Sequence, residues 1–226
     1  LRSCALFGGR TPMSYTVKEI YYTLQGEGFH TGKAAVFLRF TGCNLWSGHE
    51  KDRQRGSGGC ALWCDTNFVG MDGPGGGSYP TASALASVVA STWRGNSGQQ
   101  PFVVCTGGEP LLQLDEELIG ELHGRGFLVA VETNGTRAIP AGVDWVCVSP
   151  KSGTKVVVSN GNELKLVVPQ PGIDPASYET QSFEHFFLQP LEDECFEDHQ
   201  RLAVEYCLAH PQWRLSVQTH KVLGIA

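Results

Sequence analysis

The amino-acid sequence predicts an α/β fold in which a parallel sheet forms an incomplete β/α barrel. Short apolar runs alternate with helix-like segments along the 226 residues, which is typical of repeated βα units. Polar and glycine-rich residues follow the runs directly, and parallel barrels place their active sites at the carboxyl ends of the strands. Residues 151–161 show no helical pattern, so we expect one irregular crossover and an open barrel.

The first half of the chain supplies five predicted elements. They are a strand at 34–40 (the first of the sheet), a helix at 81–93, a strand at 102–106, a helix at 114–123 and a strand at 127–132. Gly124 and Gly126 end the second helix, because glycine commonly follows the last helical turn. A long polar loop, which has no hydrophobic periodicity from 47 to 59, separates the first two elements.

The second half continues the alternation. We expect strands at 145–148, 164–168 and 186–188, a helix near 199–210 and a last strand at 214–218. The first three of these strands stop at Ser149-Pro150-Lys151, at Pro169 and at Gln189-Pro190. These turns should therefore meet at one edge of the sheet.

Composition limits the class of protein. The net charge of -6 argues against binding along a phosphate backbone, so we expect no direct nucleic-acid partner. No apolar run approaches a membrane span, and residues 1–12 lack the apolar core of a signal peptide. We expect a cytoplasmic protein with a leader or added remnant at 1–12, a true start at Met13 and a single domain at 13–226.

Three cysteines carry the strongest chemical signal. Cys60 and Cys64 lie close together, Cys43 lies upstream, and each is beside a turn-forming residue. Three thiolates leave one corner of a cuboidal iron–sulfur cluster without a protein ligand, and a small molecule can be activated there. The alternatives are a zinc site completed by His49 and three unrelated buried cysteines.

The other five cysteines have no ligand spacing. We expect buried structural thiols at Cys4, Cys105, Cys147, Cys195 and Cys207.

Arg39 interrupts the apolar strand at 34–40. A buried guanidinium needs a partner, and its planar fork matches a substrate carboxylate. The alternative is an internal ion pair with Glu27 or Glu19. The glycines of Gly107-Gly108-Glu109 have two interpretations, because glycine allows either the close approach of a ligand or simply a tight turn. From the sequence alone, Thr66 is a cap or turn residue.

An ordered set of motifs resembles the radical S-adenosylmethionine enzymes, and within them the 7-carboxy-7-deazaguanine synthase family. The motifs are residues 18–28 (KEIYYTLQGEG), 42–48 (GCNLWSG), 64–66 (CDT), 107–110 (GGEP), 132–135 (ETNG), 189–190 (QP) and 218–221 (QTHK). The resemblance runs from about Lys18 to the C-terminus.

The resemblance implies three cofactors. A 4Fe–4S cluster would be held by Cys43, Cys60 and Cys64, with S-adenosylmethionine on the fourth iron, and Thr66 would be a ligand of Mg2+. Sixteen residues separate the first two cysteines, as in family members with an expanded loop, and three rather than two separate the last pair. A one-residue insertion in a flexible loop still allows three sulfurs to reach one cluster.

The resemblance also implies the residues of the cofactor and substrate sites. The S-adenosylmethionine site would comprise Trp63, Gly108, Glu109, Glu132, Asn134, Ser149, Pro150, Lys151, Gln189, Pro190, Leu191 and Glu192, with Glu109 and the nearby backbone receiving the cofactor's ammonium. Glu132 and Asn134 would either contact the ribose of the cofactor or form a turn, and both interpretations stay open. Glu192 stands where the family usually has an aspartate. The substrate site would comprise Leu24, Gln25, Gly26, Glu27, Arg39, Thr106, His220 and Ala226, the last where the family has proline.

The implied reaction is a radical ring contraction. It converts 6-carboxy-5,6,7,8-tetrahydropterin into 7-carboxy-7-deazaguanine with loss of ammonia, and the product serves the synthesis of 7-deazapurines such as queuosine. A one-electron donor such as flavodoxin and a homodimer are the expected partners. The alternatives are a radical enzyme of another branch, such as a glycyl-radical activase, and a non-enzymatic zinc protein.

Overall fold

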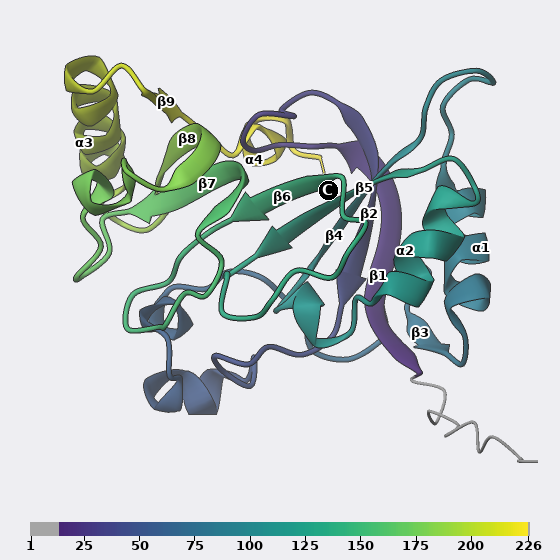
Figure 1. Cartoon of the computed structure of the whole chain (residues 1–226). Coiled ribbons are helices and arrows are strands. Elements are labelled where there is room, and N and C mark those ends of the chain that lie inside the picture. Colours follow the sequence, from purple (N-terminus) through teal and green to yellow (C-terminus); the bar gives the residue numbers. More distant parts are fainter. Residues whose placement is uncertain (1–13, 226) are drawn as a thin grey trace, which may run out of the picture.

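A computed structural model of the protein describes residues 14–225, so the predictions for residues 1–13 and for Ala226 lie outside the described part (Figure 1). Its nine-stranded sheet has the order β3-β1-β2-β4-β5-β6-β7-β8-β9. The strands are β1 (Tyr15–Leu24), β2 (Ala34–Phe40), β3 (Gly77–Tyr79), β4 (Phe102–Gly107), β5 (Leu128–Thr133), β6 (Trp145–Val148), β7 (Asn160–Val168), β8 (Ser182–Pro190) and β9 (Trp213–Leu215). The pairs from β2 to β9 are parallel, which confirms the predicted parallel sheet.

Within residues 14–225, four α-helices and four short 3-10 helices accompany the strands. The α-helices are α1 (Ala82–Thr92), α2 (Glu116–His123), α3 (Phe196–Ala209) and α4 (Thr219–Leu223); the 3-10 helices are η1 (Glu50–Arg55), η2 (Gly59–Leu62), η3 (Pro110–Leu112) and η4 (Pro175–Tyr178). The second helix begins later than predicted because the Asp115 side chain caps it, accepting a hydrogen bond from the Leu118 amide.

Residues 34–40 form a strand as predicted, but the prediction that this strand is the first of the sheet was wrong. β1 precedes β2 and pairs with it antiparallel, and β3 pairs with the far edge of β1. β1 mixes charged and apolar residues, so its sequence alone does not resemble the apolar runs of the parallel strands. The last strand also ends at Leu215 rather than 218, and α4 occupies the segment that follows Gln218.

The core lies mainly between the sheet and α1 and α2, which cover one face (Figure 1). Alternate residues of β2, including Val36, Leu38 and Phe40, are buried there, so Arg39 points to the opposite face. A second apolar cluster packs β7 and β8 against α3 at the other end of the sheet. No α-helix joins β6 to β7, as predicted for residues 151–161. The sheet has two edges, β3 and β9, so the barrel is open, which confirms the prediction.

The peripheral cysteines are only partly as predicted. Cys105 and Cys147 are buried, but Cys207 is half-buried and Cys195 is exposed. Cys195 stands at the N-cap of α3, where the helix begins at the protein surface, so the prediction of a buried thiol was wrong there. Cys4 lies outside the described residues. Among the helices of residues 14–225, none is both long and apolar enough to cross a membrane.

Candidate functional site

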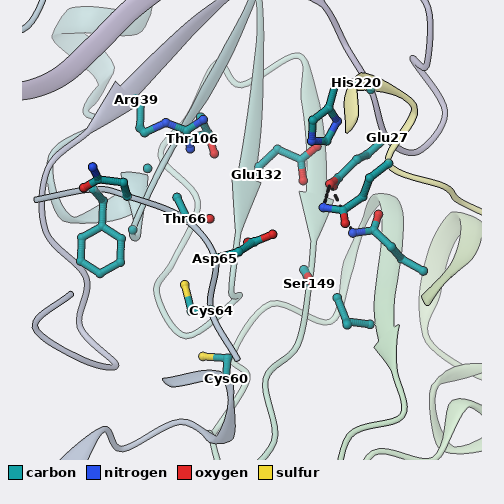
Figure 2. Close-up of a pocket in the computed structure, with 18 of the residues that line it drawn as sticks. Glu27, Arg39, Cys60, Cys64, Asp65, Thr66, Thr106, Glu132, Ser149 and His220 are labelled. Atoms are coloured by element: carbon teal, nitrogen blue, oxygen red, sulfur yellow. Dashed lines mark hydrogen bonds between the residues drawn. The ribbon is translucent and has the colours of Figure 1, made fainter. Parts of the chain in front are cut away.

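A pocket of about 580 Å³ lies at the carboxyl ends of the parallel strands (Figure 2). Its wall includes the ends of β4, β5 and β8, the turn after β6, and side chains from β7. Most of the predicted site residues line it, namely Leu24, Gln25, Gly26, Glu27, Arg39, Cys43, Cys60, Trp63, Cys64, Thr66, Thr106, Gly108, Glu132, Asn134, Ser149, Lys151, Gln189, Pro190, Leu191, Glu192 and His220. Glu109 and Pro150 are buried behind this lining.

The cysteines lie at one end of the pocket on short turns. η2 positions Cys60, and the Cys64 amide donates to the Cys60 carbonyl at 2.7 Å, so the two sulfurs belong to one compact turn. The Cys43 sulfur accepts a hydrogen bond from the Leu45 amide at 3.4 Å. Burial raises the pKa of Cys60 to about 11 and raises that of Cys43, so metal must displace the thiol protons.

Arg53 anchors the cysteine loop, a role that the sequence did not reveal. Its guanidinium donates to the carbonyls of Ala61 at 2.7 Å and Cys64 at 3.2 Å, and its Cζ lies 4.8 Å from the ring centroid of Trp46. The sequence shows only an arginine in a loop without hydrophobic periodicity, and this pattern is equally typical of a solvated arginine.

The described residues do not form the zinc site that the sequence left open. His49 is exposed and does not line the pocket, so it does not complete a site of three cysteines and one histidine. In the described part of the chain, no group of three or more His, Cys, Asp or Glu side chains is arranged to hold a metal ion. A cuboidal cluster is bound through separate iron atoms, so its thiolate ligands stand farther apart than the ligands of one ion.

The two glycines after β4 bring that strand against the first cysteine. A Cβ on Gly108 would lie 2.3 Å from the Gly42 carbonyl oxygen, and one on Gly107 would lie 2.4 Å from that of Phe40. The Glu109 amide donates to the Gly42 carbonyl at 3.0 Å. The glycines are therefore needed for contact between two backbones, and they also leave bare backbone on the pocket wall.

Glu109 is fully buried and joins the ends of β4 and β5. Its carboxylate accepts from the Leu111 amide at 3.0 Å, the Thr133 hydroxyl at 2.7 Å and the Asn134 amide at 2.8 Å. Burial raises the pKa of this carboxyl despite these bonds. In this arrangement Glu109 holds the wall from behind.

The predicted cofactor side combines a cation, an aromatic ring and polar turns. The Lys151 ammonium donates to the Ser149 hydroxyl at 2.7 Å and lies 5.4 Å from the ring centroid of Trp63. Burial lowers the pKa of Lys151. Asn134 bonds the Asn44 side chain at 3.1 Å and accepts from the Thr136 amide, so it forms a turn and also faces the pocket.

Arg39 reaches the pocket from β2 with 18% of its side chain exposed (Figure 2). Its Nε pairs with Glu19 at 2.7 Å, and Nη2 donates to the Tyr21 hydroxyl at 2.9 Å. Of the two internal partners considered from the sequence, the structure has Glu19 and not Glu27. Because Arg39 still lines the pocket, the ion pair orients the guanidinium without removing it from the site.

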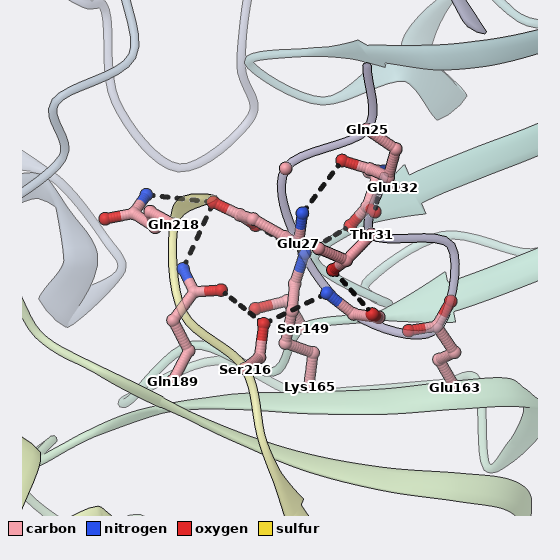
Figure 3. Close-up of polar contacts among 12 residues, drawn as sticks. Gln25, Glu27, Thr31, Glu132, Ser149, Glu163, Lys165, Gln189, Ser216 and Gln218 are labelled. Carbon is pink, nitrogen blue, oxygen red and sulfur yellow. Dashed lines mark hydrogen bonds and ion pairs between the residues drawn. The ribbon is translucent and has the colours of Figure 1, made fainter. Parts of the chain in front are cut away.

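Lys165 is the main pocket residue that sequence reasoning missed. Its ammonium pairs with Glu27 at 2.6 Å and with Glu132 at 2.9 Å (Figure 3). Gln25 donates to Glu132 at 3.2 Å, so the predicted substrate and cofactor residues share one network. The signal was available, since a lysine interrupts the apolar strand at 164–168 as Arg39 interrupts β2.

The C-terminal helix closes one side of the pocket. Thr219 of α4 donates to the Gly26 carbonyl through both its amide and its hydroxyl, at 3.0 and 2.9 Å. Gly26 leaves room for His220, whose Nδ1 would lie 2.2 Å from a Cβ at that position. Lys221 donates to Asp65 at 2.7 Å and also contacts Glu192, so it ties α4 to the segment between Cys64 and Thr66.

Curated relatives match nearly the whole chain. A 7-carboxy-7-deazaguanine synthase of Caulobacter vibrioides is 56% identical, and one of Bordetella pertussis is 55% identical, each over 94% of this chain and 100% of the relative. The synthase of Escherichia coli K12 is 33% identical over 95% of this chain and 100% of its own length. The crystal structure of QueE from Escherichia coli matches with a TM-score of 0.66 and 28% identity, over 91% of this chain and 94% of that one. No family model matches the chain.

Proposed function

The chain belongs to the 7-carboxy-7-deazaguanine synthase family, and on that premise we propose that its pocket contracts the pterin ring of 6-carboxy-5,6,7,8-tetrahydropterin. The products are 7-carboxy-7-deazaguanine, a precursor of 7-deazapurines such as queuosine, and ammonia. One observation carries the proposal: a single pocket is lined both by three cysteines, Cys43, Cys60 and Cys64, and by a cationic fork, Arg39. Cluster chemistry and recognition of a carboxylate would therefore share one pocket.

Family membership implies an iron–sulfur cluster and S-adenosylmethionine. Cys43, Cys60 and Cys64 would hold a 4Fe–4S cluster, because their thiols face the same end of the pocket. When bound, the cluster and S-adenosylmethionine supply the one-electron chemistry that removes hydrogen from the pterin C6. The cysteine turns and the walls of the pocket keep that chemistry away from bulk water.

The wall from Trp63 to Glu192 would bind S-adenosylmethionine. Lys151 and Ser149 supply a cation and a hydroxyl, and Gln189 and Glu192 supply further polar groups on the same wall. Glu109 and the nearby backbone would receive the cofactor's ammonium, and Glu109 also fixes Thr133 and Asn134 at the wall. The backbone at Gly108 remains open for the amino-acid portion of the cofactor.

The opposite side would bind the pterin. Arg39 would grip its carboxylate, the loop from Leu24 to Glu27 would bond the pterin edge, and Thr106 and His220 would complete the site. Thr66 would be one ligand of a Mg2+ ion whose other ligands are substrate and water. A one-electron donor such as a flavodoxin and a second copy of the chain are the proposed partners.

Anaerobic turnover tests the proposal. Reconstituted protein is supplied with reductant, S-adenosylmethionine, Mg2+ and the tetrahydropterin, and the products are measured by mass spectrometry. We expect more product than the S-adenosylmethionine supplied, since the cofactor is regenerated. A full cluster with no 7-carboxy-7-deazaguanine would contradict the function.

A further inference from the structure

Lys165 is a buried cation with two carboxylate partners from distant parts of the chain. It lies on β7, is 4% exposed, and is flanked by the fully buried Leu164 and Leu166. Its partner Glu27 lies on the loop after β1, and its partner Glu132 lies on β5. One ammonium therefore joins three segments that line the pocket.

Each carboxylate is held by further bonds that fix its orientation. Oε2 of Glu27 accepts from Lys165, while Oε1 accepts from Gln218 at 2.8 Å and Gln189 at 3.2 Å (Figure 3). Oε2 of Glu132 accepts from Lys165, while Oε1 accepts from Gln25 at 3.2 Å. Both carboxylates thus have all of their oxygens engaged, and Lys165 is the partner that they share.

Among residues 14–225, Lys165 is the only Lys or Arg that forms an ion pair with these carboxylates. Burial alone would raise the pKa of Glu27, but the Lys165 ammonium and hydrogen bonds from Lys165 and Gln218 lower it to about 2. Burial alone would lower the pKa of Lys165, but Glu132 and Glu27 raise it well above its ordinary value. Other titratable groups also face Lys165 and its two carboxylates. They are Cys147 of β6, Glu163 of β7, Lys151 after β6 and His220 of α4.

We propose that Lys165 is a positioning residue that couples the two ligand sites: by pairing with Glu27 and Glu132 at once, it fixes the substrate loop against the cofactor wall. The proposal rests on the function proposed above. It requires that loss of the ammonium weaken both ligands together, because both carboxylates lose their common partner. It also requires a new dependence on pH, because two partly buried carboxylates without a cation take up protons more readily as pH falls.

The test compares Lys165→Gln and Lys165→Arg with the natural chain and with Lys51→Met, a matched control at an exposed lysine. Each protein is reconstituted with its cluster. Equilibrium dialysis gives the dissociation constant of S-adenosylmethionine, and turnover gives KM for the pterin, both between pH 5.5 and 8.5. His220 is present in every variant, so only differences between variants report on Lys165.

We expect Lys165→Gln to raise both constants at least about tenfold and to weaken binding further toward pH 5.5. Lys165→Arg should restore the pH dependence of the natural chain, since it restores the charge, while both constants stay raised by its different length and shape. Lys51→Met should match the natural chain. Both constants within twofold of the natural values, or a change in only one of them, would overturn the proposal.

Two further results keep the test decisive. If Lys165→Gln fails to fold, Lys165→Arg decides alone, and an effect on one ligand only would again overturn the coupling. If the natural chain has a full cluster but makes no product, the proposed function fails. The dissociation constant of S-adenosylmethionine and its pH dependence then still show whether Lys165 supports the cofactor wall.

Discussion

The two ends of the pocket are built in different ways. At the polar end, Lys165 pairs with both Glu27 and Glu132, and two of these three residues lie on strands. At the cysteine end, Cys43, Cys60 and Cys64 lie on turns and a 3-10 helix. The polar end is complete from the protein's own side chains, whereas the thiols of the cysteine end need metal as a partner.

The difference follows from how each end obtains its order. Strand residues are fixed by backbone pairing on both sides, so a charged network can be oriented before any ligand binds. A long loop gains its order from scattered contacts, such as those of Arg53 within the loop and of Lys221 from α4. Ligand binding at the cysteine end should therefore depend on the cluster, and ligand binding at the polar end should depend on charged side chains that are already oriented.

The largest effect should come from breaking the cysteine end. Cys60→Ala removes a ligand of the proposed cluster, so we expect loss of the cluster's visible absorbance and a fall in turnover of at least about a thousandfold. Cys195→Ala, which alters an exposed cysteine on α3, is the control and should retain both. Normal cluster content in Cys60→Ala would show that the cysteine end is not the cluster site.

Arg39 tests recognition of the substrate carboxylate. Arg39→Ala should lower kcat/KM for the pterin about a hundredfold, mainly through KM, because a charge-assisted bidentate contact is lost. Arg39→Lys should recover only part of this loss, since an ammonium lacks the planar fork. The control is Arg201→Ala, which changes an arginine that is 66% exposed. Equal KM values for Arg39→Ala and the natural chain would place the substrate carboxylate elsewhere.

The polar end should also be visible in the pH dependence of stability. The pKa of Glu27 is lowered to about 2 in the folded chain, so its contribution, up to about 3 kcal/mol, is present above the unfolded value near 4.5 and is lost as pH falls toward 2. In urea unfolding, the natural chain should exceed Glu27→Gln in stability at pH 7. This difference should shrink steadily between pH 5 and pH 2.5. A constant difference would mean that Glu27 is not held ionised by its partners.

Lys221 should show the smallest effect, because it links the two ends through exposed groups. Its partners Asp65 and Glu192 are 60% and 43% exposed, so Lys221→Met should cost less than about 1 kcal/mol of stability. We expect a few-fold rise in the Mg2+ concentration needed for half-maximal turnover, since Asp65 adjoins Thr66. Lys51→Met should leave the Mg2+ requirement unchanged. If Lys221→Met also leaves the Mg2+ requirement unchanged, α4 does not influence the proposed metal site.

Much of the fold could be predicted because local pattern and local structure agree. The predicted strands at 34–40 and 145–148 match β2 and β6 at both ends, and α1 differs from its prediction by one residue at each end. β1 could not be recognised in the same way, because its order depends on antiparallel pairing with β2. Exposed Cys195 shows the same limit, since the sequence around it does not indicate that α3 begins at the protein surface.

Many residue types of the site could be read from the sequence. The cysteines, Arg39 and the glycines after β4 were identified because each breaks a local pattern or follows a strand. The ion-pair partners are fixed by the tertiary structure: Glu19 rather than Glu27 for Arg39, both Glu27 and Glu132 for Lys165, and Asp65 for Lys221. Periodicity reports the environment of a residue along its own strand or helix. A charge pair between segments far apart in the chain depends on how the whole sheet brings their ends together.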